Sequence, residues 1–392
     1  MRIAIIGGGI GGLTTALALR QFGFDPQVFE QAPDLLEVGA AILMWPNAMR
    51  VLHRLGLAEK IGEHGGLLEK GCWLTREGEL LKQFRLPPTE VPAIALHRAE
   101  LQHALLEPLP HDSIHLGHTL ESYEQFPDHV LAHFSNGSAF ESDLLIAADG
   151  IHSRVREQLL NDGPPFDHGY QAWRGVVSHR PASVPAATAI EIYGPGQRFG
   201  VGPLGFGKLG WWASTNAPIK STDAATARDE LLRQFDGWCD PVSELIEATP
   251  LNSLIRNPVC DRRAVRGWSS DAIILLGDAI HPTTPNLGQG GCLAIEDAAV
   301  LARCLHKYGS AAGSDNREAG SQISKALRNF ERLRYSRTTT IARYSRVYGK
   351  IGQWETTGAV QLRRLAQVLV PRGLIESFLG RVFNYDAYSV HI

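Results

Sequence analysis

The first residues that could do chemistry are the glycines that follow the opening apolar run. Gly7, Gly9 and Gly12 form a GxGxxG pattern, with a strand expected before them over 2–6 and a helix after them over 12–22. Glycines at this spacing allow a tight turn and let the backbone approach a pyrophosphate. The positive end of the helix then faces the phosphates. The pattern therefore predicts a dinucleotide site, to which we also assign Gly11.

An acidic residue supports this interpretation. A second strand is expected over 25–30 and ends in Glu30, where a carboxylate can bind the adenosine ribose hydroxyls. An acid at this place disfavours a 2′-phosphate, so the site is not built for NADP. We count the neighbouring Gln31 with the same site.

A second GxGxxG pattern lies at Gly205–Gly210, between β-like runs over 199–204 and 211–214. No helical pattern follows it, so we predict a hairpin turn there. The chain therefore has one dinucleotide site, and a nicotinamide cofactor must bind without a second domain of this kind.

Two further motifs follow buried strands expected over 144–148 and 272–276. Asp149-Gly150 follows the first strand, with Arg156 six residues on. Gly277-Asp278 follows the second strand and continues through Pro285 into the loop Gly288–Cys292 and a helix expected over 293–304.

In combination these motifs resemble those of the group A flavoprotein aromatic hydroxylases, the para-hydroxybenzoate hydroxylase-like superfamily. The resemblance covers nearly the whole chain and includes Arg98, which is similar to that family's flavin-contacting arginine, and the segments Val38–Ile42 and Trp45–Asn47. Within the family, the chain is similar to urate hydroxylases, zeaxanthin epoxidase-like proteins and salicylate hydroxylase-like proteins. The resemblance implies that the dinucleotide is FAD.

The residues implied to bind the cofactor come from every motif. They are Gly7, Gly9, Gly11, Gly12, Glu30, Gln31, Leu43, Arg98, Leu120, Asp149, Arg156, Asp278, Gly288, Gln289, Gly290, Gly291 and Cys292.

Their chemistry fits a flavin. Asp278 can accept hydrogen bonds from ribityl hydroxyls, and Gly288–Cys292 has little bulk, so backbone can lie against a flat ring. The following helix then places its positive end at the flavin, where it stabilises negative charge on the reduced ring. We expect His281 to support the loop and Cys292 to pack rather than react. Arg156 has the alternative of a structural salt bridge.

The resemblance also implies a reaction. NAD(P)H reduces FAD, O2 adds to give a flavin C4a-hydroperoxide, and one oxygen atom passes to a small aromatic or heteroaromatic substrate. The protein must exclude water around this chemistry. Two alternatives stay open: a related FAD oxidoreductase that inserts no oxygen, and a non-catalytic flavin-binding protein.

The substrate is expected over a middle sheet. Candidates are the segments 170–174 and 197–199, with Trp211 and Trp212. The tryptophans can stack on an aromatic ring, but core packing is their commoner fate. We assign catalytic positions to Arg174 and Arg198, for an anionic or phenolate-like substrate, and to Pro285, which by family likeness shapes the reactive flavin edge. For each arginine, a fold-supporting or surface role is the commoner alternative. Urate hydroxylases use an arginine and a tyrosine in this pocket. Arg198 matches the first, but the tyrosine's place falls near Trp211.

A resemblance to the 3-hydroxybenzoate hydroxylases is missing one residue of the pocket. The 3-hydroxybenzoate hydroxylases carry a pocket histidine before the proline of Val201-Gly202-Pro203, and this sequence has none there. A pocket without an evident base suits a substrate that is already activated, or one deprotonated by water or flavin.

These motifs require an α/β fold. We predict a Rossmann-like FAD-binding domain of the GR2 type, interrupted by an antiparallel-sheet substrate domain and followed by C-terminal helices. The expected units are 1–70 with 95–165 and 262–325 for FAD, 71–94 with 166–261 for the substrate, and 326–392 for the helices. We expect a helical pattern from Ser324 to the C-terminus and an exposed loop over 308–320.

Bulk properties restrict the class of protein. A net charge of −3 over 392 residues gives no general attraction to nucleic acid or anionic membrane. Five scattered cysteines without a CxxC pair argue against a disulfide framework or zinc site and for a reducing compartment. We expect a cytoplasmic monomer or homodimer with no metal and no membrane insertion, acting with O2 on a small molecule.

Overall fold

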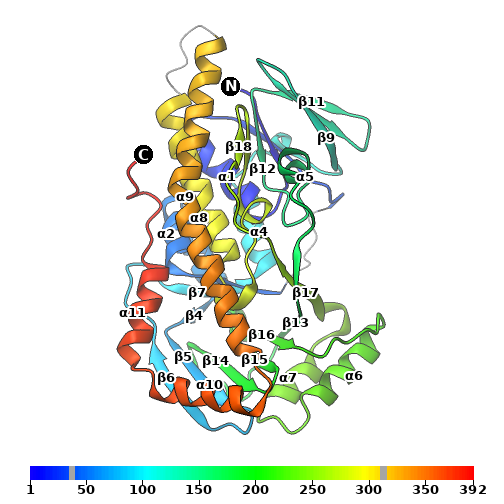
Figure 1. Cartoon of the computed structure of the whole chain (residues 1–392), viewed down its shortest axis with the longest axis vertical. Coiled ribbons are helices and arrows are strands. Elements are labelled where there is room, and N and C mark those ends of the chain that lie inside the picture. Colours follow the sequence, from blue (N-terminus) through cyan, green and yellow to red (C-terminus); the bar gives the residue numbers. More distant parts are fainter. Residues whose placement is uncertain (35–39, 310–315) are drawn as a thin grey trace.

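The computed structural model describes residues 1–34, 40–309 and 316–392. It is elongated, with a parallel sheet at one end, a large mixed sheet at the other and one long helix alongside both (Figure 1). In the part described, no helix has the length and apolar character needed to cross a membrane. No group of three or more metal-ligating side chains that could hold an ion occurs there either.

The parallel sheet is built from short strands, and the residues of its four central strands are all or nearly all buried. Its order is β18-β19-β12-β1-β2-β8, and only β18 runs antiparallel to its neighbour. The strands are β1 (Ile3–Ile6), β2 (Pro26–Phe29), β8 (Ile114–His115), β12 (Leu144–Ala147), β18 (Ser269–Ser270) and β19 (Ile273–Leu275). The three predicted motifs therefore follow the carboxyl ends of the adjacent strands β1, β12 and β19.

Helices cover this sheet, and two small antiparallel sheets flank it. The helices are α1 (Ile10–Arg20), α2 (Pro46–Arg54), α3 (Ala58–His64), α4 (Arg98–Leu106), α5 (Arg154–Leu160) and α8 (Gly290–Gly309). One small sheet holds β3 (Ala41–Met44), β7 (Ala93–His97) and β4 (Gly66–Leu68), and the other β9 (Leu120–Gln125), β10 (Val130–Phe134) and β11 (Ala139–Ser142).

The large sheet has the order β17-β13-β16-β15-β14-β5-β6. Its strands are β5 (Lys70–Thr75), β6 (Leu80–Arg85), β13 (Phe166–Val177), β14 (Thr188–Gly194), β15 (Gln197–Pro203), β16 (Leu209–Thr215) and β17 (Ile255–Asp261). The prediction of an antiparallel sheet is confirmed except for β14 and β5, which pair in parallel. One face packs on α6 (Ala224–Gln234) and α7 (Val242–Ala248) in a core of its own.

The predicted hairpin at the second glycine pattern is confirmed. Gly205–Gly207 forms a single 3-10 turn between the antiparallel strands β15 and β16, and Phe206 in it has a φ of 59°. Backbone that turns this sharply between two strands presents no helix N-terminus to a phosphate.

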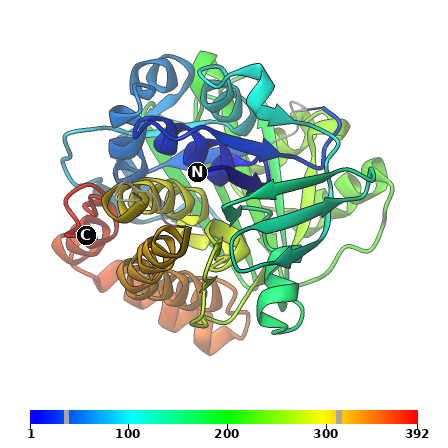
Figure 2. The ribbon, with the colours of Figure 1, turned by 90° about the horizontal axis from the view of Figure 1, so that it is seen from above.

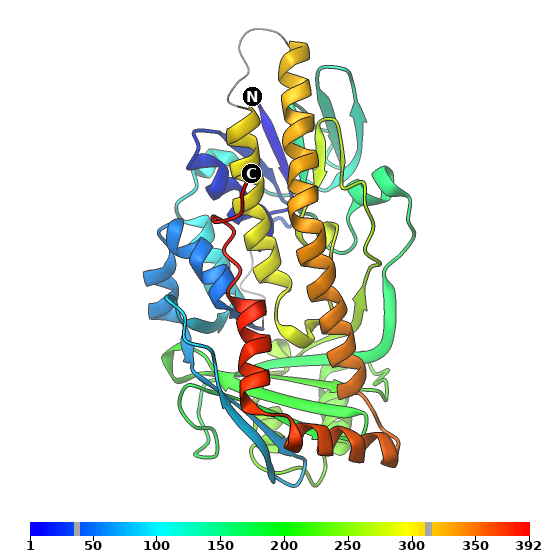
Figure 3. The same cartoon turned by 60° about the vertical axis from the view of Figure 1, so that its left-hand side comes forward.

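Three C-terminal helices lie against both sheets: α9 (Asn316–Gly352), α10 (Thr357–Leu369) and α11 (Arg372–Phe383). Viewed down the long axis, they gather on one side of the molecule (Figure 2). α9 runs beside α8 and continues to the large sheet (Figure 3). The boundary expected after 325 falls inside α9.

The expectation of helix to the C-terminus is wrong for 384–392. Asn384 ends α11, and the tail returns to α8, where Arg303 donates to the carbonyls of Ala387 and Val390. Of the loop expected over 308–320, both ends are helical, and 310–315 lie outside the described residues.

Candidate active site

The glycine turn after β1 has no room for side chains at two positions. A Cβ on Gly7, whose φ is +107°, would lie 2.4 Å from the Ala148 carbonyl oxygen. A Cβ on Gly12 would lie 1.9 Å from the carbonyl oxygen of Gly7. The turn is thereby pressed against the end of β12, which brings the first motif beside the second.

Gly9 differs from these two residues. It is the N-cap of α1, and a Cβ built on it would meet no heavy atom within 4 Å. The exposed backbone of Gly9 and the free N–H groups of the first helical turn form the anion-binding arrangement that a pyrophosphate needs. Gly11 has another role, since its Cβ would meet Ala294 and Leu276 at 3.3 Å, so it allows α1 to pack closely on α8.

Glu30 stands beside the same turn. Its carboxylate accepts hydrogen bonds from the backbone N–H of Gly8 at 2.6 Å and of Ala32 at 2.9 Å. The side chain amide of Gln102, on α4, donates to the Gly8 carbonyl at 3.1 Å. Sequence reasoning missed Gln102, because only the packing of α4 on α1 brings it to the turn.

Asp149 retains hydrogen-bonding capacity in a buried place. Its Oδ2 accepts from the backbone N–H groups of Arg154 and Val155 at the start of α5. Its Oδ1 is buried, and no partner for it occurs among the described residues. Desolvation by burial raises the pKa of Asp149. Such an orphaned acceptor fits a ligand that brings a hydroxyl or amide donor.

Arg156 has the geometry of the structural alternative. Its side chain is fully buried and pairs with Asp162, with an Nη2–Oδ2 distance of 2.5 Å. Nη1 donates to the carbonyls of Ala279 and Ile280, at 3.2 and 2.6 Å. Arg156 thus joins α5 to the loop after β19 rather than facing open space.

Asp278 and Arg98 are the exposed charges near this loop. Asp278 follows β19, and Arg98 is the first residue of α4. The Asp278 carboxylate is exposed to solvent and accepts no hydrogen bond from any described residue, so it can accept one from a ligand hydroxyl.

The loop before α8 turns its large side chains inward. Gln289 is fully buried and accepts a hydrogen bond from the Asn47 amide at 3.0 Å. A Cβ on Gly290 would meet only Asp278 Oδ1, at 3.8 Å, and one on Gly291 would meet Ile42 at 3.1 Å. The loop therefore offers backbone, and not the amide of Gln289, to a flat ring.

Cys292 packs as expected. Its side chain is fully buried, and desolvation raises the pKa of the thiol to about 12. Its Sγ lies 3.4 Å from the carbonyl oxygen of Leu43 on β3, so the thiol ties that strand to the start of α8.

A buried charge cluster anchors the loop to α9. Asp297 accepts from the Gly277 N–H at 2.9 Å, approaches His281 Nε2 at 2.5 Å and pairs with Arg334 at 2.7 Å. Arg334 also pairs with Glu296 at 2.7 Å, and all three charged side chains are fully buried. His281 therefore supports the loop, as predicted.

The face of the large sheet opposite α6 and α7 carries the substrate candidates. Strand alternation and register place Arg174, Arg198 and Trp212 on this face. Trp211 follows the core-packing alternative: it points to the opposite face, packs on Phe199 and donates to Thr249 Oγ1 at 2.8 Å.

The segment 170–174 alternates in the same way. Trp173 is almost fully buried among the residues that pack on α6 and α7. Arg174 is partly exposed, and its Nη1 donates to Asn257 at 3.3 Å. Desolvation, followed by the charge of Arg98, lowers the pKa of Arg174.

Asn286 connects this face to the loop after β19. It follows the exposed Pro285 in a 3-10 turn, and its Oδ1 accepts from Arg198 Nη2 at 2.5 Å. Its amide donates to Tyr170 Oη at 3.1 Å. The proline expected at the flavin edge therefore immediately precedes the residue that contacts Arg198, the buried arginine of the sheet.

Three predicted cofactor residues differ in their exposure and in their distance from the loop before α8. Leu120 is buried in the core at the start of β9. Gln31 is exposed just after β2. Leu43 packs against Gly288, whose Cβ would lie 3.0 Å from its side chain. Of the segment Val38–Ile42, residues 38 and 39 lie outside the described part of the chain.

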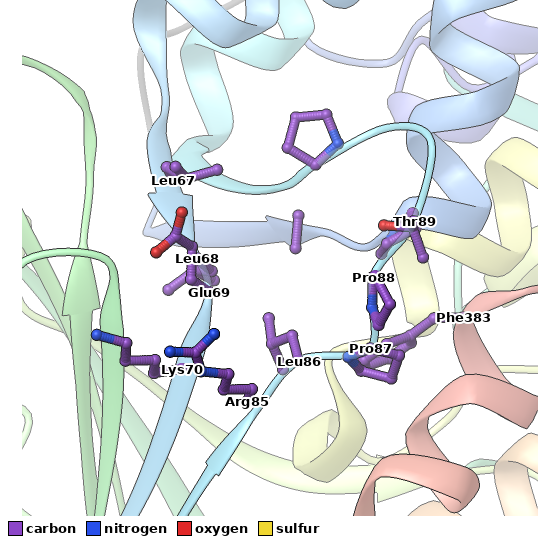
Figure 4. A pocket seen from close by; sticks show the side chains of 13 residues that line it. Leu67, Leu68, Glu69, Lys70, Arg85, Leu86, Pro87, Pro88, Thr89 and Phe383 are labelled. Atoms are coloured by element: carbon purple, nitrogen blue, oxygen red, sulfur yellow. The ribbon is translucent and has the colours of Figure 1, made fainter.

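A cavity of about 390 Å³ opens elsewhere, between β4, β6 and α11 (Figure 4). Lys70 and Arg85 lie along one side of it, and Phe383 lies across from them. Leu68 and Leu86 line it and belong to an apolar cluster that also contains Leu43 and Trp45. None of the predicted cofactor or substrate residues lines this cavity.

Comparison with known proteins identifies the ligand of the glycine turn. Residues 1–318 match the family model described as an FAD binding domain. The chain belongs to this family of flavin-dependent monooxygenases. FAD is therefore its cofactor, and the open Gly9, the unpartnered Oδ1 of Asp149 and the exposed Asp278 fit that dinucleotide.

Relatives cover almost the whole chain. The aurachin C monooxygenase/isomerase of Stigmatella aurantiaca is 39% identical over 93% of this chain and 92% of its own length. An FAD-dependent urate hydroxylase of Klebsiella pneumoniae is 34% identical over 97% and 99%. The crystal structure of Klebsiella pneumoniae HpxO with FAD and uric acid has a TM-score of 0.87 at 32% identity, covering 98% and 97% of the two chains.

Proposed function

We propose that this flavin-dependent monooxygenase uses NAD(P)H and O2 to hydroxylate a small aromatic or heteroaromatic substrate that lies on the face of the large sheet opposite α6 and α7. The observation that carries the proposal is the contact between Arg198 and Asn286, at 2.5 Å. It ties the sheet face to the turn that bears Pro285. A ring on Trp212 is thereby placed beside the loop that contacts the flavin.

FAD, when bound, supplies the redox chemistry, accepting electrons from NAD(P)H and activating O2 so that one oxygen atom enters the substrate. The chain's own residues bind and orient. The N–H groups after Gly9 bind the pyrophosphate, and Glu30 and Asp278 accept hydrogen bonds from sugar and ribityl hydroxyls.

The start of α8 has an electrostatic role. Gly290 and Gly291 leave the backbone N–H groups of the first turn accessible, and a helix of 20 residues stands behind them. Each such favourable charge interaction contributes about 0.3–1 kcal/mol. These groups stabilise the negative charge that a flavin acquires on reduction.

Neither Cys292 nor His281 serves as a side-chain base beside this loop. Cys292 keeps its proton because burial raises the pKa of its thiol to about 12. His281 is engaged with Asp297. The protein therefore works chiefly by positioning the ring, which is itself a large source of rate enhancement.

Two alternatives are a flavin oxidoreductase that inserts no oxygen and a non-catalytic flavin-binding protein. The test is a screen of neutral and anionic aromatic compounds for those that accelerate NADH or NADPH oxidation by the holoprotein, with H2O2 measured in parallel. A substrate gives fast oxidation with little H2O2. Acceleration in which H2O2 accounts for all the nicotinamide consumed contradicts the proposal.

A further inference from the structure

Sequence reasoning assigns Arg198 to an anionic substrate, but in the structure its guanidinium is paired with other residues of the protein. The side chain is 1% exposed. Nη1 pairs with Glu191 at 3.3 Å, Nε donates to Gln353 Oε1 at 3.0 Å, and Nη2 donates to Asn286 at 2.5 Å. All three guanidinium nitrogens thus have a protein partner.

The end of α9 closes over this guanidinium. A Cβ on Gly352 would lie 2.7 Å from Arg198 Cδ and Nε, so only glycine fits there. Gln353 is itself fixed, because its amide donates to the Gly196 carbonyl and to Asn216 Oδ1. Arg198 cannot turn toward a ligand without breaking these contacts.

Glu191, on β14, remains partly accessible. Its side chain is 15% exposed, and its Oε2 accepts a hydrogen bond from Tyr348 Oη at 2.7 Å. Tyr348 Oη also lies 2.5 Å from Tyr193 Oη, and burial raises the pKa of both hydroxyls well above their usual value. These tyrosines stay neutral, and of the Arg198–Glu191 ion pair only the carboxylate is accessible, with 15% of its side chain exposed against 1% for Arg198.

An aromatic surface adjoins this carboxylate. Register places Glu191, Gly200, Trp212 and Arg174 in one row across β14, β15, β16 and β13. A Cβ on Gly200 would lie 2.2 Å from Trp212 Nε1, so the indole lies over this glycine, on the side toward Glu191. The Arg198 guanidinium carbon stands 5.1 Å from the indole centroid.

The other cations nearby are placed differently. Arg363 lies over the Tyr193 ring and donates to the carbonyls of Gly352 and Gly194, where it caps the end of α9. Arg174 stands at the far end of the row, next to Asn257 and within electrostatic reach of Arg98. Neither one pairs with Glu191.

From this arrangement we infer that Glu191 determines substrate specificity. The site takes a neutral aromatic ring that stacks on Trp212 and donates an N–H or O–H group to the Glu191 carboxylate, and it rejects an anionic ring at that position. This inference rests on the proposed function and names its substrate class. It replaces the anionic substrate expected from Arg198 alone.

The test compares two ligands of nearly equal size, 4-hydroxybenzamide and 4-hydroxybenzoate, titrated into the oxidised holoprotein near neutral pH. Binding is read from the change in flavin absorbance, without NAD(P)H. We expect the neutral amide to bind at least about tenfold more tightly, which corresponds to about 1.4 kcal/mol. A carboxylate that binds as tightly as the amide, or more tightly, overturns the inference.

Variants locate the effect. Glu191→Gln keeps the size of the side chain and removes its charge, so the amide's advantage should fall to within about threefold, less than 1 kcal/mol. The matched control is Glu247→Gln, an exposed residue of α7 on the other side of the sheet, which should keep the wild-type ratio. An unchanged ratio in Glu191→Gln overturns the assignment. If that variant loses its flavin, the wild-type ratio decides alone.

The two proposals fail separately, because binding to the oxidised flavin does not depend on oxygen insertion. A neutral preference in a protein that never hydroxylates contradicts only the proposed function. An anionic preference in a protein that does hydroxylate contradicts only the role of Glu191.

Discussion

Gly9→Ala separates cofactor binding from folding more sharply than any other single change in the glycine turn. Gly9 has a φ of −77° and a ψ of −175°, which alanine adopts without strain, and its Cβ would meet no protein atom within 4 Å. The apoprotein should therefore keep its stability. The new methyl group occupies the space through which the pyrophosphate reaches the backbone, and a hydrogen bond to a charged group contributes about 1.5–3 kcal/mol. Loss of one such bond weakens FAD binding about 10- to 150-fold.

The assay is fluorescence titration of apoprotein with FAD, with the thermal midpoint of the apoprotein measured alongside. Gly62→Ala is the matched control, since Gly62 also has no atom within 4 Å of its Cβ but lies on the exposed helix α3. An affinity within about twofold of wild type in Gly9→Ala, well below the loss of one charged hydrogen bond, refutes the placement of the pyrophosphate.

Three further predictions concern residues around the flavin. Glu30→Ala should weaken FAD binding by about 1–3 kcal/mol, because the ribose loses a charged acceptor, and unaltered affinity in the same titration refutes the ribose role. Asp297→Asn should lower the free energy of unfolding by about 3–5 kcal/mol, because it breaks a buried ion pair with Arg334. Burial raises the pKa of Asp297, but His281 and Arg334 outweigh burial and hold it below its usual value. This stabilisation is therefore complete above about pH 4, the unfolded pKa, and is lost as pH falls through the folded one. Urea unfolding of the wild type and the variant, at neutral pH and again in acid below the folded pKa, checks this. A wild-type advantage that is as large in acid as at neutral pH contradicts it. Cys292 should resist thiol reagents at mildly alkaline pH in the native state, since its pKa is about 12, and rapid labelling shows the burial to be incorrect.

The sequence predicted the parts of the fold that depend on local pattern. Three short apolar runs are each followed by a turn that contains glycine, a local pattern typical of buried parallel strands. They are Ile3–Ile6 and the strands before Asp149 and Asp278. Because all three strands are parallel neighbours, their motifs had to meet at one edge. The cofactor site was predictable for this reason.

The substrate face was harder to predict, because it depends on which way each strand faces. Trp211 and Trp212 are equal candidates in the sequence, and only the register with β13 and β15 shows that Trp211 belongs to the core. Glu191 could have been noticed as the polar residue in an otherwise apolar run, Ala189–Tyr193. Its pairing with Arg198, and the cover that Gln353 provides from the end of α9, depend on long-range packing that no local pattern encodes.

The most direct test of the monooxygenase account supplies 18O2 to the holoprotein with NAD(P)H and a compound that accelerates nicotinamide oxidation. The molecular mass of the product is then measured by mass spectrometry. The account predicts one atom of 18O in each product molecule and none when the label is supplied as H2 18O. A product without label from 18O2, formed at the rate of nicotinamide oxidation, would contradict it.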